Sequence, residues 1–219
     1  MNKMSTRTRL LKLALPLISE HGFTRTTLAR SVLHLPTPQA HAEPLSDTAV
    51  SALFGHGTLA RRTLIGAWMD AGLESMRRGA DASKSVSVKD ALHARLEYNE
   101  PVLAHLPEAF ALLASPDSGL PPVDPLPALK HAARVADEAC HLSADQSLRL
   151  SWYLKRGSLI GVYSAAELHQ LTSPRSAHAF LDSLLSASSA IESSVKDVEQ
   201  FSSYVFRSWA GIIKSRDIL

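Results

Sequence analysis

The sequence is poor in several features that mark large protein classes. Its 219 residues contain a single cysteine, Cys140, which excludes an internal disulfide framework and any zinc site built from several cysteines. One thiol fits a reducing compartment without proving one. No run of about 18 uninterrupted apolar residues occurs, so no segment is expected to span a membrane.

Excess charge of one sign is also missing. The chain has 23 Lys and Arg residues against 21 Asp and Glu residues, a formal net charge of +2. A DNA-binding domain usually concentrates basic residues on one face, so this weak balance does not favour a nucleic-acid partner. Hydrophobic residues make up 45% and charged residues 20%, an ordinary composition for one globular domain or two fused ones.

Familiar catalytic motifs are absent as well. There is no Gly-x-Ser-x-Gly elbow, phosphate loop, dinucleotide fingerprint or His-Glu-x-x-His run. Glu138 and His141 have the Glu-x-x-His spacing of di-iron bundles, but that site needs a second such pair and two more carboxylates. Cys140 adjoins His141, yet neighbouring helix positions point apart. We predict a non-enzyme without cofactor or metal, with a buried, unreactive thiol.

Strand signals are missing too, because no alternating apolar run is joined to another by a tight Asn-Gly or Asp-Gly turn. The chain is therefore predicted to be all-α. Apolar spacing, caps and proline or glycine stops predict helices over residues 10–18, 24–33, 47–54, 58–78, 86–98, 109–113, 128–141, 145–171, 177–191 and 196–219.

The stretch from Asp137 to Leu171 is the most informative part of the chain. After a break at Leu142 and Ser143, it restarts as a proline-free run with apolar residues on more than one helical face. Such a helix is expected in the middle of a bundle rather than on its surface. The apolar residues are Leu148, Trp152, Leu154, Leu159, Ile160, Tyr163 and Leu168.

The first turns of this run differ, because they combine aromatic and basic side chains. That composition is typical of a protein contact surface. Alternatively, Trp152 and Tyr153 are ordinary core aromatics, and helical spacing does not separate the two interpretations. The residues concerned are Arg149, Trp152, Tyr153, Lys155 and Arg156.

The two ends of the chain each allow more than one interpretation. The first 19 residues are basic and free of acid, as in a transit peptide, and could also pass for a weak signal-peptide core. We favour an amphipathic helix that Gly22 ends. Residues 196–219 form an apolar stripe with basic margins, suited to a membrane interface or to docking on the chain's own domain or a twin subunit. The stripe contains Phe201, Tyr204, Val205, Trp209, Ile212 and Ile213.

One set of residues matches a known family in order and spacing: Asp137, Glu138, His141, Asp145-Gln146-Ser147, Trp152-Tyr153, Arg156, Tyr163 and Glu167-Leu168. In these positions the chain resembles the Coq-nine family of coenzyme Q (ubiquinone) biosynthesis proteins. Cys140 departs from the family, in which an aromatic residue is common at that position.

The resemblance implies a TetR-like fold. Residues 1–78 would form a helix-turn-helix-like subdomain, residues 79–192 a lipid-binding helical bundle, and residues 193–219 an amphipathic helix that associates with membranes. The helix expected to enter a DNA groove, SDTAVSALF, has no Lys or Arg, and DNA affinity depends strongly on phosphate neutralisation. A TetR-like, ligand-responsive transcription regulator is nevertheless the alternative function.

The resemblance further implies a non-catalytic accessory protein at the matrix face of the mitochondrial inner membrane, for which a homodimer is one option. It would bind phospholipid or isoprenoid quinone intermediates and present them to the di-iron demethoxyubiquinone hydroxylase. The implied lipid-binding residues are Leu159, Ile160 and Tyr163. The implied partner-binding residues are His141, Asp145, Trp152, Tyr153 and Arg156. The implied membrane-binding residues are Phe201, Tyr204, Trp209, Ile212 and Ile213.

Overall fold

The computed structural model describes residues 5–37, 39, 41–81, 86–116, 123–143 and 150–191, and within them it contains helices and no strand. The predicted all-α class is confirmed. None of the described helices is long and apolar enough to cross a membrane. With η for a 3-10 turn, the order is α1 (Thr6–Ala14), η1 (Leu15–Leu17), α2 (Ile18–His21), α3 (Arg25–Arg30), η2 (Ser31–His34), α4 (Asp47–Phe54), α5 (Thr58–Asp81), α6 (Val88–Glu97), η3 (Glu100–Val102), α7 (Leu106–Ala114), α8 (Leu126–Leu142), α9 (Leu150–Thr172), η4 (Pro174–Ser176) and α10 (Ala177–Ile191).

Local sequence signals set many of these boundaries. The side chains of Thr24 and Ser46 accept hydrogen bonds from the backbone N–H groups at the starts of α3 and α4, which would otherwise lack partners. Gly22 and Gly55 end α2 and α4 with φ of 66° and 110°, a region that favours glycine. The predicted first helix is interrupted at Pro16, where the chain forms the turn η1.

The chain divides into two compact units. The first runs to Ala71 and includes Ala104–Leu112, and the second comprises Gly72–Leu103 and the chain from Leu113 onward. In the first unit α1, α3, α4 and η2 pack together around a core that includes Phe23, whose ring meets that of Trp68 edge to face at 5.6 Å. The predicted boundaries after residues 78 and 192, between the first subdomain, the bundle and the last helix, stay predictions.

Within the first unit, one arginine fastens α3 to α4. Arg25 Nε donates to Asp47 Oδ1 at 2.8 Å, and its Nη2 donates to Ser51 Oγ at 2.7 Å. The acidic residue at the start of α4 is therefore already paired with a cation of the same unit. A DNA-binding function would require α4 to be basic. The ion pair does not supply that charge, because α4 itself contains no Lys or Arg.

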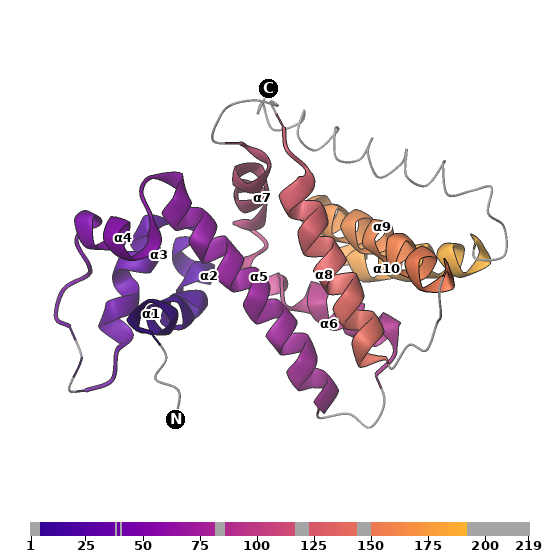
Figure 1. Cartoon of the computed structure of the whole chain (residues 1–219), viewed down its shortest axis with the longest axis horizontal. Coiled ribbons are helices and arrows are strands. Elements are labelled where there is room, and N and C mark those ends of the chain that lie inside the picture. Colours follow the sequence, from indigo (N-terminus) through magenta and orange to yellow (C-terminus); the bar gives the residue numbers. More distant parts are fainter. Residues whose placement is uncertain are drawn as a thin grey trace. The chain divides into compact units, whose positions relative to one another are not determined.

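In the second unit α6, α8, α9 and α10 pack as a bundle (Figure 1). The predicted central position of the helix after residue 145 is confirmed, because α9 contacts all three of the others and its side chains from Leu159 to Leu168 are largely buried. α5 also contributes residues to the shared core. The buried core cluster contains Leu73, Met76, Ala91, Leu92, Leu96, Ala132, Val135, Ala136, Ala139, Cys140, Leu159, Val162, Tyr163, Ala166 and Leu181.

Two ion pairs cross-link the helices of this bundle. Arg77 of α5 holds Glu138 of α8 through two hydrogen bonds of 2.7 and 2.5 Å. Arg156 of α9 donates from Nε to Asp137 of α8 at 2.9 Å. Glu138, half of the Glu-x-x-His pair, is therefore occupied by an arginine, as a structural role requires.

Candidate functional site

A set of buried polar side chains lies inside the second unit, where α6, α8 and α9 meet. We call it the buried polar cluster. Polar groups this far from water must find partners within the protein, since burial without them costs free energy. The cluster consists of Arg95 of α6, Asn99 in the turn that follows α6, His131 of α8, and Tyr163, Glu167 and Gln170 of α9, all essentially inaccessible to solvent.

Arg95 and Asn99 connect the cluster across the bundle. Arg95 donates to the side-chain oxygen of Asn99, and its Nη2 lies 3.2 Å from His131 Nε2. Asn99 Nδ2 in turn donates to Gln170 Oε1 at 3.0 Å and to Glu167 Oε1 at 3.3 Å. The chain of contacts therefore runs from α6 to both α8 and α9.

The α9 residues complete the network. Tyr163 donates its hydroxyl hydrogen to Glu167 Oε1 at 2.6 Å, as their four-residue spacing on one helix face allows. His131 Nε2 lies 3.5 Å from the same oxygen. Gln170 Nε2 donates to the backbone oxygen of Leu96 at 2.9 Å. One carboxylate oxygen of α9 thus joins α9 itself, α8 and the turn that follows α6.

The charges in the cluster compensate one another. Burial alone would raise the pKa of the Glu167 carboxyl, but the charge and hydrogen bond of His131, the charge of Arg95 and the Tyr163 hydroxyl outweigh it and lower that pKa to about 2. Burial raises the pKa of the Tyr163 hydroxyl well above its usual value, against the opposing charge of Arg95. At neutral pH Glu167 is therefore ionised and Tyr163 keeps its proton.

The members of the cluster bond mainly to one another. Gln170 Nε2 is directed instead at the backbone oxygen of Leu96. His131 Nδ1 is buried without a hydrogen-bond partner among the described residues. Within the same residues, no three His, Cys, Asp or Glu side chains gather so that they could hold a metal ion.

The predicted lipid-binding residues lie beside this cluster. Leu159 and Tyr163 are buried in the core cluster, and Ile160 is partly buried against it. Tyr163 joins the two environments, since its ring packs in the apolar core while its hydroxyl bonds Glu167. The structure brings the three residues together on α9; their lipid contact stays a prediction.

The predicted partner-binding residues are distributed around the α8–α9 junction. His141 is exposed near the end of α8, while its neighbour Cys140 is buried, so the two point apart as predicted. Tyr153 is 69% exposed near the start of α9. Arg156 is largely covered and bonded to Asp137, which makes it a helix cross-link as well as a candidate contact residue.

Several predicted residues fall outside the described part of the structure. Asp145 lies between α8 and α9 in a range that is not described, and Trp152 is described for its helical backbone alone. The whole predicted membrane-binding set, Phe201, Tyr204, Trp209, Ile212 and Ile213, lies beyond Ile191, where the description ends.

Sequence reasoning missed most of the buried polar cluster. One signal was available: Arg95 and Asn99 continue the apolar stripe of Leu92 and Leu96 at spacings of three and four residues. A charged residue on an apolar stripe indicates a buried, paired charge. The identity of its partners on α8 and α9 could not follow from spacing within α6.

Comparison with known proteins gives a consistent result. The sequence model of the COQ9 family matches residues 126–192, which comprise α8, α9 and α10. The chain is 27% identical over 162 residues to the mitochondrial ubiquinone biosynthesis protein COQ9 of Bos taurus, covering 73% of this chain and 49% of that protein. It is 26% identical over 197 residues to COQ9-A of Xenopus laevis (87% and 60%).

A third relative extends the match along nearly the whole chain. The mitochondrial ubiquinone biosynthesis protein COQ9 of Drosophila melanogaster is 26% identical over 226 aligned positions, covering 97% of this chain and 64% of that protein. The chain thus spans from about half to just under two thirds of the length of these relatives. The three matches and the α8–α10 family match agree with the resemblance noted from residues 137–168, and this chain is similar to COQ9 proteins along most of its length.

Proposed function

We propose that this chain is a non-catalytic, lipid-binding accessory protein of ubiquinone biosynthesis. In this proposal the second unit holds an isoprenoid quinone intermediate and presents it to the di-iron demethoxyubiquinone hydroxylase. The site of action would be the matrix face of the mitochondrial inner membrane, with residues 193–219 as the membrane-associating segment.

The family match over residues 126–192 carries this proposal. It coincides with the three helices that contain every implied lipid-binding residue and the described partner-binding residues. The relatives are named as mitochondrial ubiquinone biosynthesis proteins, which supports the pathway and the compartment proposed for this chain.

The distribution of side chains along α9 gives physical support. Near its start, Tyr153 and Leu154 are exposed, whereas further along Leu159 and Tyr163 are buried in the core cluster. One helix therefore joins an exposed aromatic surface to the apolar interior. A protein that binds an apolar ligand and also docks on an enzyme needs both features.

The chemistry of the proposed ligand explains why such a protein is needed. A polyprenyl quinone is almost insoluble in water because its tail is apolar throughout. Its head group must nevertheless reach an active site. An apolar bundle at the membrane surface can shelter the tail while the enzyme acts on the head group, without performing any bond chemistry itself.

Lipid extraction tests this function directly. We expect organic extracts of the purified full chain, analysed by mass spectrometry, to contain isoprenoid quinone or phospholipid in stoichiometric amounts. Leu159→Gln should reduce that amount severalfold, because it places an amide on the proposed lining. Leu126→Gln, at an exposed position on α8, should retain it. Extracts without lipid, or equal losses in both variants, would contradict the proposal.

A further inference from the structure

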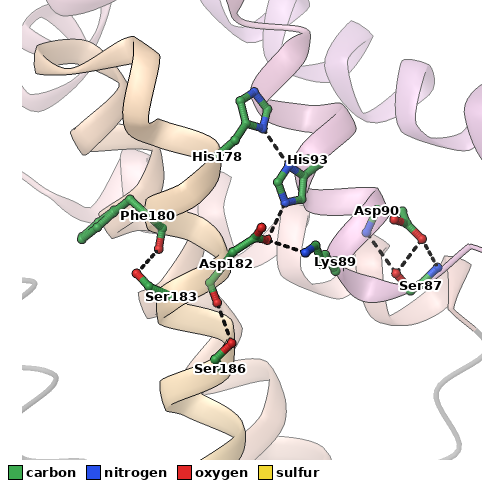
Figure 2. Close-up of polar contacts among 9 residues, drawn as sticks. All are labelled: Ser87, Lys89, Asp90, His93, His178, Phe180, Asp182, Ser183 and Ser186. Atoms are coloured by element: carbon green, nitrogen blue, oxygen red, sulfur yellow. Dashed lines mark hydrogen bonds and ion pairs between the residues drawn. The ribbon is translucent and has the colours of Figure 1, made fainter.

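Two histidines from distant parts of the sequence meet where α10 crosses α6. His93 of α6 and His178 of α10 are 85 residues apart, yet their Nδ1 atoms lie 2.7 Å from each other. Figure 2 shows the two rings with Lys89 and Asp182 beside them. We call His93 and His178 the histidine pair. Both side chains are partly accessible to water, at 20% and 32%.

The rings meet edge to edge. Their planes are 12° from parallel and their centroids are 4.9 Å apart, a separation consistent with two imidazoles whose edges are in hydrogen-bond contact. Two nitrogen atoms this close require a hydrogen between them. The arrangement is therefore one Nδ1–H donating to one Nδ1 lone pair, with a single proton shared by the pair.

The outer nitrogens determine which ring donates when both are neutral. His93 Nε2 lies 2.8 Å from Asp182 Oδ1, and an ionised carboxylate only accepts, so this nitrogen carries a hydrogen. A neutral His93 then has an unprotonated Nδ1, which accepts from His178. On the far side, His178 Nε2 is 3.6 Å from Glu100 Oε1.

The hydrogen bond between the two Nδ1 atoms depends on how many protons the pair carries. The neutral pair and the singly protonated pair each keep one hydrogen between the two Nδ1 atoms. A doubly protonated pair carries a hydrogen on both, so the hydrogen bond is lost and two cations face each other. After the rings separate, the outer carboxylates of Asp182 and Glu100 can each hold one imidazolium.

We propose that the histidine pair is a proton-controlled latch, which fastens α10 to α6 near neutral pH and releases it when both rings are protonated. Imidazole is the side chain suited to this role, since it titrates between about pH 5 and 8. The proposal does not depend on the lipid-binding function.

The charged groups around the histidine pair do not themselves change protonation state in mild acid. They are Lys89 and Asp90 on α6, Glu100 on η3 and Asp182 on α10. Hydrogen bonds from His93 and Lys89 lower the pKa of Asp182, and those from Ser87 lower the pKa of Asp90, so both carboxylates stay ionised in mild acid.

The helix α9 also packs against α10, and it contributes a further titratable side chain, His169. His169 of α9 stacks on Phe180 with centroids 4.3 Å apart and bonds Ser176. Its partners are an aromatic ring and a hydroxyl rather than a second imidazole, so protonating it creates no pair of facing cations.

Hydrogen exchange of the full chain tests the latch. We expect protection factors in α10, corrected for intrinsic exchange, to fall about five- to tenfold between about pH 7.5 and about pH 5.5, as the loss of one hydrogen bond and the added repulsion predict. Protection in α8 should change little. Equal loss in α8 and α10 would indicate general acid loosening and overturn the proposal, as would an α10 that does not respond.

His178→Asn provides the matched variant. The Asn amide can place a donor near the position of the imidazole Nδ1, and it does not titrate in this range. We expect α10 in this variant to stay protected at both pH values. His141→Asn, the same change at an exposed histidine of α8, should behave like the unmodified chain. If α10 of His178→Asn lost protection as the unmodified chain does, the pair would not be the sensor.

Discussion

At the scale of single residues, resemblance and structure assign different roles to the same side chains. Tyr163 and Glu167 belong to the set that matches the COQ9 family, and in the structure they bond each other in the buried polar cluster. Asp137 and Arg156 belong to the same set and form a helix cross-link. Part of the matching set therefore holds α8 and α9 together, through Asp137 and Arg156 and through Glu167, which faces His131 of α8.

Glu167→Gln should destabilise the fold in a pH-dependent way. The variant leaves Arg95 without its buried counter-charge, so the free energy of unfolding should fall by about 3 kcal/mol at neutral pH. The folded-state pKa of Glu167 is about 2, below the ordinary value of about 4.3. The stabilisation is therefore complete above about pH 5 and is lost as pH falls toward 2.

Urea unfolding at about pH 7 and about pH 3 measures this effect. The difference between Glu167→Gln and the unmodified chain should be clearly smaller in acid. Glu97→Gln, at an exposed position of α6, should show little difference at either pH. A Glu167→Gln penalty of equal size at both pH values would mean that the carboxylate's charge is not what stabilises the cluster.

At the scale of elements, α5 offers two glycines in contrasting surroundings. A Cβ added at Gly66 would meet nothing within 4 Å, whereas at Gly72 it would lie 2.9 Å from Arg95 Nε and 3.1 Å from Tyr98 Cδ1. Arg95 is fully buried and bonded to Asn99, so its guanidinium cannot withdraw without losing partners. Gly72 allows α5 and α6 to approach closely.

Alanine at these two positions should therefore have opposite effects. Gly66→Ala should raise the free energy of unfolding by about 0.5–1 kcal/mol, because alanine is the better helix former. Gly72→Ala gains the same helix propensity, but the added methyl group overpacks the space beside Arg95. The free energy of unfolding should therefore fall by about 1–3 kcal/mol. Urea unfolding of the two variants decides the matter. Equal stabilisation by both variants would show that the Arg95 side chain can move away from the new methyl group with little loss of free energy.

Element boundaries were largely predictable, whereas contacts between elements were not. Thr24, Ser46 and Gly22 act on backbone groups within a few residues of themselves, so their effects follow from local sequence. The buried polar cluster and the histidine pair join residues that are far apart in the chain. Spacing identified Arg95 as lying beside an apolar stripe, but its partner His131 depends on how three helices pack.

At the scale of the whole molecule, function depends on surfaces as well as on the bundle interior. Tyr153 was predicted as a contact residue and is 69% exposed, which the alternative of an ordinary core aromatic does not explain. Trp152, its neighbour, is not described beyond its backbone. Tyr153 is therefore the aromatic of the proposed docking surface that can be changed with least risk to the fold.

Tyr153→Ser should weaken capture of the hydroxylase about tenfold or more, since an aromatic hot-spot residue contributes about 2 kcal/mol or more to binding. Quantitative pull-down with purified hydroxylase measures the loss. Leu126→Ser, an apolar residue of α8 that is 50% exposed, should bind as the unmodified chain does. Undiminished capture by Tyr153→Ser would remove this residue from the proposed contact surface.

The lone cysteine has a practical consequence for studying this chain. Cys140 is 1% exposed within the core cluster of the second unit, and no other thiol competes with it. A thiol-reactive dye has one target in the natural sequence, and reaching it requires the interior face of α8 to become accessible. The labelling rate of the unaltered protein thus reports how often that interior opens, without any engineered probe.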